Sequence, residues 1–233
     1  MKLLVGNFKM NLLNDEIIDY IDNFDFNGSN IVLCPSSLYL KDFINKGFNV
    51  GIQNIGFEDK GAYTGDISAS MAKSIGVKYA IVGHSERRQY YNDDIYVKRK
   101  LKQLLDNGIT PILCIGENLE VRQSNGTNDF LKKELDDALT DLNGIENIII
   151  AYEPIWSIGT GNIPSNDDIK DTIRYIKDYI LENYKVDIKV LYGGSVNNDN
   201  ISTLEEVDNI DGYLVGGCSI NVEKFLNLEK MIK

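Results

Sequence analysis

Short apolar runs alternate with longer amphipathic stretches from one end of the chain to the other. Most of the runs are continuously apolar rather than alternating, which is typical of strands that are buried on both faces of a parallel sheet. The pattern therefore predicts strands over residues 3–7, 30–34, 48–53, 79–83, 109–116, 147–152, 188–193 and 211–216.

The stretches between these runs have the spacing of amphipathic helices. Residues 165–182 are predicted to form one such helix, with Ser165 as its N-cap after Pro164. Its apolar positions fall on one helix face, and a leucine stripe before the sixth run has a similar spacing. The two stripes are Ile169, Ile173, Ile176 and Ile180, and Leu131, Leu135, Leu139 and Leu142.

Eight strands that alternate with helices predict an α/β fold with a parallel sheet. The number of units favours a closed (β/α)8 barrel, with eight parallel strands inside a layer of outer helices, although counting alone leaves an open doubly wound sheet as an alternative. No linker or low-complexity segment interrupts the sequence, so we expect a single domain over 1–233. The first two units are short, and their helices are expected to be trimmed.

Composition and charge restrict the possible functions more than they restrict the possible folds. The net charge of −11 argues against broad binding to nucleic acid or to a membrane surface, so any anionic substrate must be held by local groups. With one histidine and three scattered cysteines, neither a Cys/His metal site nor a disulfide framework is expected. The N-terminal apolar stretch is too short for a signal peptide, and a cytoplasmic location is expected.

Polar residues and glycines gather just after the predicted strands. In a (β/α)8 barrel the C-terminal ends of the strands meet at one mouth, where the chemistry of this fold takes place. Taken singly, each residue has an ordinary structural interpretation, such as a surface cation or a turn, and only their convergence favours a site. They are Asn7 and Lys9 after the first strand, His84, Ser85 and Glu86 after the fourth, Glu153 after the sixth, Gly193, Gly194 and Ser195 after the seventh, and Gly216 and Gly217 after the eighth.

The side chains in this set suit proton transfer next to a carbonyl group. Glu153 can remove the proton, while His84 and Lys9 polarise the oxygen as an enediolate develops. Three glycine-rich loops supply backbone N–H groups for an anion such as phosphate, and the last two are expected to lead into helix N-termini. No P-loop or GxGxxG pattern is present, so no nucleotide or dinucleotide cofactor is expected. The loops are 159–161, 192–195 and 215–218.

Seven motifs resemble the triosephosphate isomerase family, and they keep the family's order from the first predicted strand to the last. The resemblance implies a TIM barrel enzyme, an aldose–ketose isomerase that interconverts dihydroxyacetone phosphate and D-glyceraldehyde 3-phosphate in glycolysis and gluconeogenesis without a cofactor. The motifs are GNFKMN (6–11), GAYTGDIS (61–68), VGHSERR (82–88), PILCIGE (111–117), AYEPIWSIGTG (151–161), YGGSV (192–196) and DGYLVGG (211–217).

Carried over residue by residue, the resemblance implies a role for each polar position. Glu153 matches the base that moves the proton, and Ser85 matches the residue that holds this base in the empty site. His84 matches the electrophile, and the early N–H groups of the helix predicted to follow it disfavour an imidazolium. Lys9 matches the substrate-binding cation, with Asn7 and Glu86 beside it. The positions that match phosphate-binding residues are Gly159, Gly193, Gly194, Ser195, Gly216 and Gly217.

The resemblance also implies a homodimer. The loop 61–68 matches the segment of the family that inserts into a neighbouring subunit, with Thr64 near its tip. Four positions depart from the family's common pattern without touching a proposed catalytic side chain, and two of them leave the kinetics of the loop after Glu153 open. The departures are Phe8, Ser157, Asn162 and Cys218.

The segment after Glu153 is predicted to cover the site. Pro154 restricts the strand exit, and Trp156 is large enough that its indole N–H is expected to find an acceptor. Ile155 and Ile158 extend the apolar cover that excludes water. Gly159, with the two residues after it, gives the far end room to hinge.

Two other functions stay open on the residues alone. One is another phosphate-binding barrel enzyme, such as a Schiff-base aldolase, for which Lys9 is the only lysine placed well for chemistry. The other is a noncatalytic barrel that serves as a binding scaffold, which has no need for intact Lys9, His84 and Glu153.

Overall fold

The computed structural model describes residues 1–25, 28–157 and 164–233, and the eight predicted strands form one parallel sheet within them. Neighbouring strands pair in the order β2-β1-β8-β7-β6-β5-β4-β3. The strands are β1 (Leu3–Asn7), β2 (Ile31–Cys34), β3 (Gly51–Ile52), β4 (Tyr79–Val82), β5 (Thr110–Ile115), β6 (Ile149–Tyr152), β7 (Lys189–Tyr192) and β8 (Gly212–Val215).

The two end strands of this order meet and close the sheet. Leu33 of β2 forms a parallel bridge with Val50, next to β3, and its N–H donates to the carbonyl oxygen of Asn49 at 2.9 Å. The closed barrel that was predicted is therefore confirmed, and the alternative of an open doubly wound sheet is wrong.

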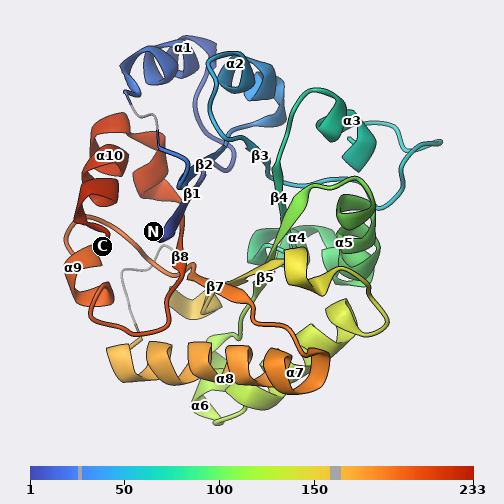
Figure 1. The fold of residues 1–233 in the computed structure, drawn as a ribbon, viewed down its shortest axis with the longest axis vertical. Coiled ribbons are helices and arrows are strands. Elements are labelled where there is room, and N and C mark those ends of the chain that lie inside the picture. Colours follow the sequence, from blue (N-terminus) through green and yellow to red (C-terminus); the bar gives the residue numbers. More distant parts are fainter. Residues whose placement is uncertain (26–27, 158–163) are drawn as a thin grey trace.

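Helices surround the ring of strands, as Figure 1 shows. The predicted helix over 165–182 is confirmed as α8, and the hydroxyl of Ser165 caps it by accepting the N–H of Asp168. The described α-helices are α1 (Asn14–Asn23), α2 (Leu40–Asn45), α3 (Ala69–Ser74), α4 (Ser85–Tyr91), α5 (Val97–Asp106), α6 (Leu119–Gln123), α7 (Thr127–Leu139), α8 (Asn166–Tyr184), α9 (Ile201–Leu204) and α10 (Val222–Met231).

Apolar side chains fill two layers, which explains why the strands read as continuous apolar runs. One cluster lies inside the barrel, and a larger one lies between the strands and the helices, where it includes the isoleucine stripe of α8. The cluster inside the barrel consists of Val5, Val32, Cys34, Ile81, Ile112, Cys114, Ile149, Ala151, Leu191 and Leu214.

Two elements differ from the sequence pattern. The predicted third strand over 48–53 is reduced to Gly51–Ile52. At its start the N–H of Phe48 donates to Phe43 in the turn after α2, and at its end the side chain of Gln53 donates to carbonyl oxygens of the neighbouring segments. Leu142 lies beyond the end of α7, since Thr140 leaves the helical conformation with ψ of 132° and Asp141 follows with a left-handed φ of 58°. Of the two helices expected to be trimmed, α2 is short, with six residues, whereas α1 has ten, as many as α5 and α10.

Within the described ranges, with the gaps at 26–27 and 158–163, none of the helices combines the length and the apolar character that crossing a membrane requires.

Candidate active site

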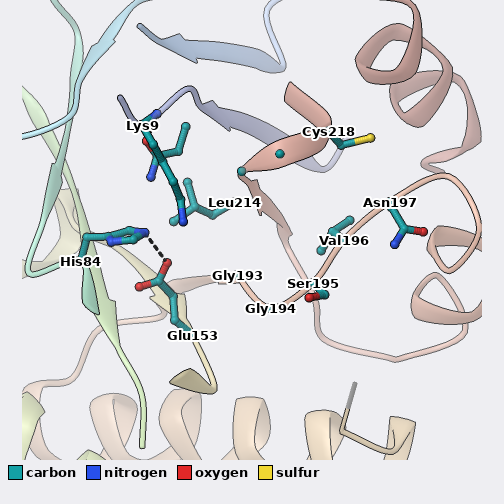
Figure 2. A pocket seen from close by; sticks show the side chains of 13 residues that line it. Lys9, His84, Glu153, Gly193, Gly194, Ser195, Val196, Asn197, Leu214 and Cys218 are labelled. Atoms are coloured by element: carbon teal, nitrogen blue, oxygen red, sulfur yellow. Dashed lines mark hydrogen bonds and ion pairs between the residues drawn. The ribbon is translucent and has the colours of Figure 1, made fainter. Parts of the chain in front are cut away.

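One cavity of about 260 Å³ lies at the C-terminal ends of the strands. Figure 2 shows Lys9, His84 and Glu153 at one end of it and Ser195, Val196 and Asn197 at the other, with Gly193 and Gly194 between them. The fold therefore brings together residues that are far apart in the sequence. The lining residues are Asn7, Lys9, His84, Glu153, Gly193, Gly194, Ser195, Val196, Asn197, Leu214, Gly216, Gly217 and Cys218.

His84 is held by the start of the helix that follows it. His84 is the N-cap of α4 and is only 4% exposed, and its Nδ1 accepts the N–H of Glu86 at 3.2 Å. An acceptor Nδ1 carries no proton, so the ring hydrogen lies on Nε2. The Nε2–H points toward Oε1 of Glu153, 3.3 Å away, as the dashed line in Figure 2 marks.

Glu153 is buried directly after β6. Its Oε2 accepts the backbone N–H of Ser85 at 3.4 Å, so an amide at the start of α4 holds the carboxylate. Cys114 lies beneath it inside the barrel, where burial and the Glu153 carboxylate raise the pKa of the thiol. The thiol therefore stays neutral, and it adds no second charge beside the carboxylate.

Lys9 is fixed by a strained backbone and an ion pair. Its φ of 54° is unusual for a residue with a side chain, and such strain persists only where neighbouring contacts impose it. Oδ1 of Asn7 accepts the N–H of Lys9, and Gln53 donates to the carbonyl oxygen of Lys9 at 2.8 Å. The Lys9 ammonium reaches Oε1 of Glu86 at 2.7 Å, so its charge is held at the cavity wall.

The glycine-rich side of the cavity offers bare backbone. The loop at 215–218 leads into a short 3-10 helix, η5 (Gly217–Ile220), and a methyl group added at Gly217 would meet no atom within 4 Å. The loop at 192–195 does not enter a helix at once, because turns over 197–200 precede α9, so that expectation is wrong. Gly159, predicted beside them, lies with Ile158 and Asn162 outside the described residues.

The chain that follows Glu153 folds back onto the strand ends. Ile155, Trp156 and Ser157 form a 3-10 turn, η4 (Ile155–Ser157), and the Trp156 indole donates to Oε1 of Glu117 at 3.3 Å. The expected acceptor for the indole is therefore found. Ser195 donates its hydroxyl hydrogen to the carbonyl oxygen of Ser157 at 2.7 Å, which joins this turn to the loop after β7.

Sequence reasoning assigned no role to several residues at this mouth. Gln53 and Glu117 act only through contacts that the fold creates. Cys218, which departs from the family's common pattern, lines the cavity, and its Sγ lies 3.7 Å from Oδ1 of Asn198. Arg88 and Glu134 form an ion pair behind the base. The second arginine of HSERR was the one available signal for this pair.

A second cavity of about 370 Å³ adjoins the first and shares Asn7, Lys9 and His84 with it. Met10 lines it and is 97% exposed. Residues 61–66 are exposed as well, and Figure 1 shows the segment before α3 projecting beyond the ring of helices.

Comparison with known proteins agrees over the length of the chain. The family model described as triosephosphate isomerase matches residues 2–232. The chain is 40% identical to the triosephosphate isomerase of Alkaliphilus oremlandii, over 97% of each protein. It is 38% identical to that of Thermodesulfovibrio yellowstonii, over 98% of each, and 40% identical to that of Mycoplasmopsis pulmonis, over 97% of this chain and 96% of the relative.

Proposed function

The chain belongs to the triosephosphate isomerase family, and on this premise we propose that it interconverts dihydroxyacetone phosphate and D-glyceraldehyde 3-phosphate by proton transfer through an enediolate. One observation carries the proposal: a carboxylate, an imidazole and an ammonium line one cavity together with two glycine-rich loops. This combination supports chemistry at a carbonyl next to a phosphate-bearing carbon.

Glu153 is the base in this proposal. Its carboxylate removes a proton from the hydroxyl-bearing carbon next to the carbonyl and returns it to the carbonyl carbon. A second proton passes from the hydroxyl oxygen of the first carbon to the oxygen of the second, which completes the conversion of ketose to aldose. The low exposure of Glu153, at 3%, supports this role because water is kept from the proton while the carboxylate carries it.

His84 and Lys9 stabilise the charge that develops on the substrate oxygens. The Nε2–H of His84 is a donor that needs no reorientation, since Nδ1 is fixed by the amide of Glu86. The Lys9 ammonium adds a positive charge at the same wall, and Asn7 and Glu86 hold it in place.

The phosphate is proposed to bind at the glycine-rich loops of the same cavity. Backbone N–H groups near Gly194, Gly216 and Gly217 supply donors without side chains in the way, whereas the N–H of Gly193 already donates to Tyr152 and the hydroxyl of Ser195 to Ser157. Local donors of this kind let a chain with a net charge of −11 bind a dianion.

The functional unit is proposed to be a homodimer of single-domain chains, each spanning 1–233. The loop 61–68, exposed over 61–66 with Thr64 near its tip, and the exposed Met10 beside the second cavity support contact between two subunits near the site.

A coupled assay with D-glyceraldehyde 3-phosphate tests the proposal. We expect turnover by the wild-type chain and a loss of about 10²- to 10⁴-fold in kcat for Glu153→Gln, because the isosteric amide cannot accept the proton. Glu146→Gln, an exposed position before β6, is the matched control. Well-folded wild-type protein without turnover would contradict the proposal, and borohydride trapping of Lys9 with substrate would favour the aldolase alternative.

A further inference from the structure

A buried ion pair lies behind the candidate base, on the side away from the substrate cavity. Arg88 of α4 places Nη1 3.3 Å from Oε1 of Glu134 on α7, and the two side chains are only 14% and 12% exposed. Asp94, at the surface, also pairs with Nη1 of Arg88. Neither Arg88 nor Glu134 lines the substrate cavity, so neither has a place in the proposed proton transfer.

Arg88 ties together the ends of two strands. Its Nε donates to the carbonyl oxygen of Gly83 at 2.6 Å, after β4, and its Nη2 donates to the carbonyl oxygen of Cys114 at 2.9 Å, in β5. Gly83 has a φ of +69°, and a methyl group added there would lie 2.8 Å from Nη2 of Arg88. The guanidinium therefore occupies the space beside the residue that immediately precedes His84.

Glu134 holds the backbone just after β5, next to Glu153. Its Oε2 accepts the N–H of Gly116 at 2.8 Å. Gly116 lies so close to the backbone of Glu153 that an added methyl group would be 1.7 Å from the carbonyl oxygen of Glu153. A void of about 10 Å³ is lined by Arg88 and Glu134 on one side and by Ser85 and Glu153 on the other.

We propose that Arg88 and Glu134 are positioning residues that set the separation between the imidazole of His84 and the carboxylate of Glu153. Arg88 holds the backbone before His84 to β5, and Glu134 holds the end of β5 against the backbone of Glu153. Holding both strand ends requires the planar guanidinium of Arg88, whose donors point in fixed directions, and a lysine ammonium cannot replace it. The inference rests on the proposed function, because it concerns the two groups that carry the proposed proton transfer.

The electrostatics of the pair make it sensitive to pH near neutrality. Burial raises the pKa of Glu134 to about 7, although Arg88 and the N–H of Gly116 act in the opposite direction. The other charged or titratable groups that face it are Asp94 from the 3-10 turn η2 (Asp93–Tyr96), Glu117 after β5, and the neutral thiol of Cys114, with Lys133 next to it on α7. The ion pair is therefore complete above neutral pH and weakened below it.

The first test is Arg88→Lys, which keeps the charge but not the fork. We expect kcat to fall about 10- to 100-fold, because small misplacements of a base and an electrophile are costly. KM should change by less than about threefold, since the phosphate wall is untouched. Leu135→Ala, a core substitution on the same helix, is the control: it lowers the melting temperature and leaves kcat unchanged.

The second test is Glu134→Gln, which is isosteric and folds even if Arg88→Lys does not. Its kcat is expected to fall at pH 8, and the wild-type kcat profile should contain an inflection near pH 7 that the variant lacks. If both variants keep the wild-type kcat and the wild-type pH profile, or if only KM changes, the inference is wrong. Absence of turnover in the wild-type protein would instead overturn the proposed function, so the two failures are distinguishable.

Discussion

The indole nitrogen of Trp156 lies 3.3 Å from Oε1 of Glu117, and this contact ties the turn that follows Glu153 to the end of β5. The hydroxyl of Tyr152 also lies 3.2 Å from both carboxylate oxygens of Glu117. Burial raises the pKa of Glu117, while its hydrogen bonds to Trp156 and Tyr152 lower it. One buried carboxylate thus joins the strand before the base to the turn after it.

Trp156 reports this contact directly, because it is the only tryptophan in the chain. In Glu117→Ala the indole loses its hydrogen bond to the Glu117 carboxylate, and we expect a shift in the tryptophan emission maximum and weaker activity. Glu120→Ala, one residue into α6, removes a surface carboxylate and serves as the control. An unchanged emission spectrum in Glu117→Ala would show that the contact does not persist in solution.

Glu134 gives the folded chain a dependence on pH with a defined sign. Because its pKa rises from 4.5 to about 7 on folding, its contribution to stability is complete below about pH 4.5 and is lost as the pH rises through about 7. The shift corresponds to about 3 kcal/mol. Relative to the wild type, Glu134→Gln should therefore gain stability between about pH 5 and pH 8, measured by urea unfolding at each pH. A difference that stays constant with pH would contradict this.

The ionised form of Glu134 both lowers the stability of the fold and carries the proposed positioning role. The ionised carboxylate holds Arg88 and the N–H of Gly116 most strongly, yet ionisation in a buried site is unfavourable. The chain thus keeps a destabilising charge where two strand ends must be held in place, as is common at functional sites.

Much of the fold follows from short-range patterns. Continuous apolar runs predicted all eight strands, and Ser165 before an isoleucine stripe predicted the start of α8. The third strand was overestimated at both ends, because Phe48 belongs to the turn after α2 and Gln53 forms hydrogen bonds through its side chain, and neither feature shows in the apolar pattern.

The site residues that directly follow strands were predictable from the sequence, whereas those that support them from the helices were not. Lys9, His84 and Glu153 each come just after a strand, so a closed barrel places them at one cavity. Glu134 lies on a helix with several acidic residues, and nothing in its local sequence distinguishes it from a solvent-exposed carboxylate. Its burial is decided by Arg88, which reaches it from a different helix.

Gly217 offers a test of the phosphate wall that leaves the fold intact. A methyl group added there meets no atom within 4 Å, so Gly217→Ala should keep the wild-type melting temperature. The methyl group nevertheless points into open space at the start of η5, where it hinders the approach of an anion to the backbone.

We expect KM for D-glyceraldehyde 3-phosphate and the inhibition constant of inorganic phosphate to rise about tenfold in Gly217→Ala, which corresponds to about 1.4 kcal/mol of lost binding. Gly126→Ala, where the added methyl group makes ordinary contacts at 3.4 and 3.5 Å before α7, is the matched control. If phosphate inhibits Gly217→Ala as strongly as it inhibits the wild type, the anion does not bind at this wall.

The proposed dimer is tested by a charge at the tip of the exposed loop. Thr64→Arg is expected to produce monomers, because it places a bulky cation within the proposed contact between subunits, next to Gly65 and Asp66 of the second cavity. Sedimentation velocity at several concentrations measures the change, and kcat should fall with it, since Lys9 lines that cavity and loses its supporting surroundings. Leu181→Arg, on the exposed face of α8, adds the same charge elsewhere and should leave the dimer intact. A wild-type chain that sediments as a fully active monomer at every concentration would rule out the dimer and leave the exposure of Met10 without a partner surface.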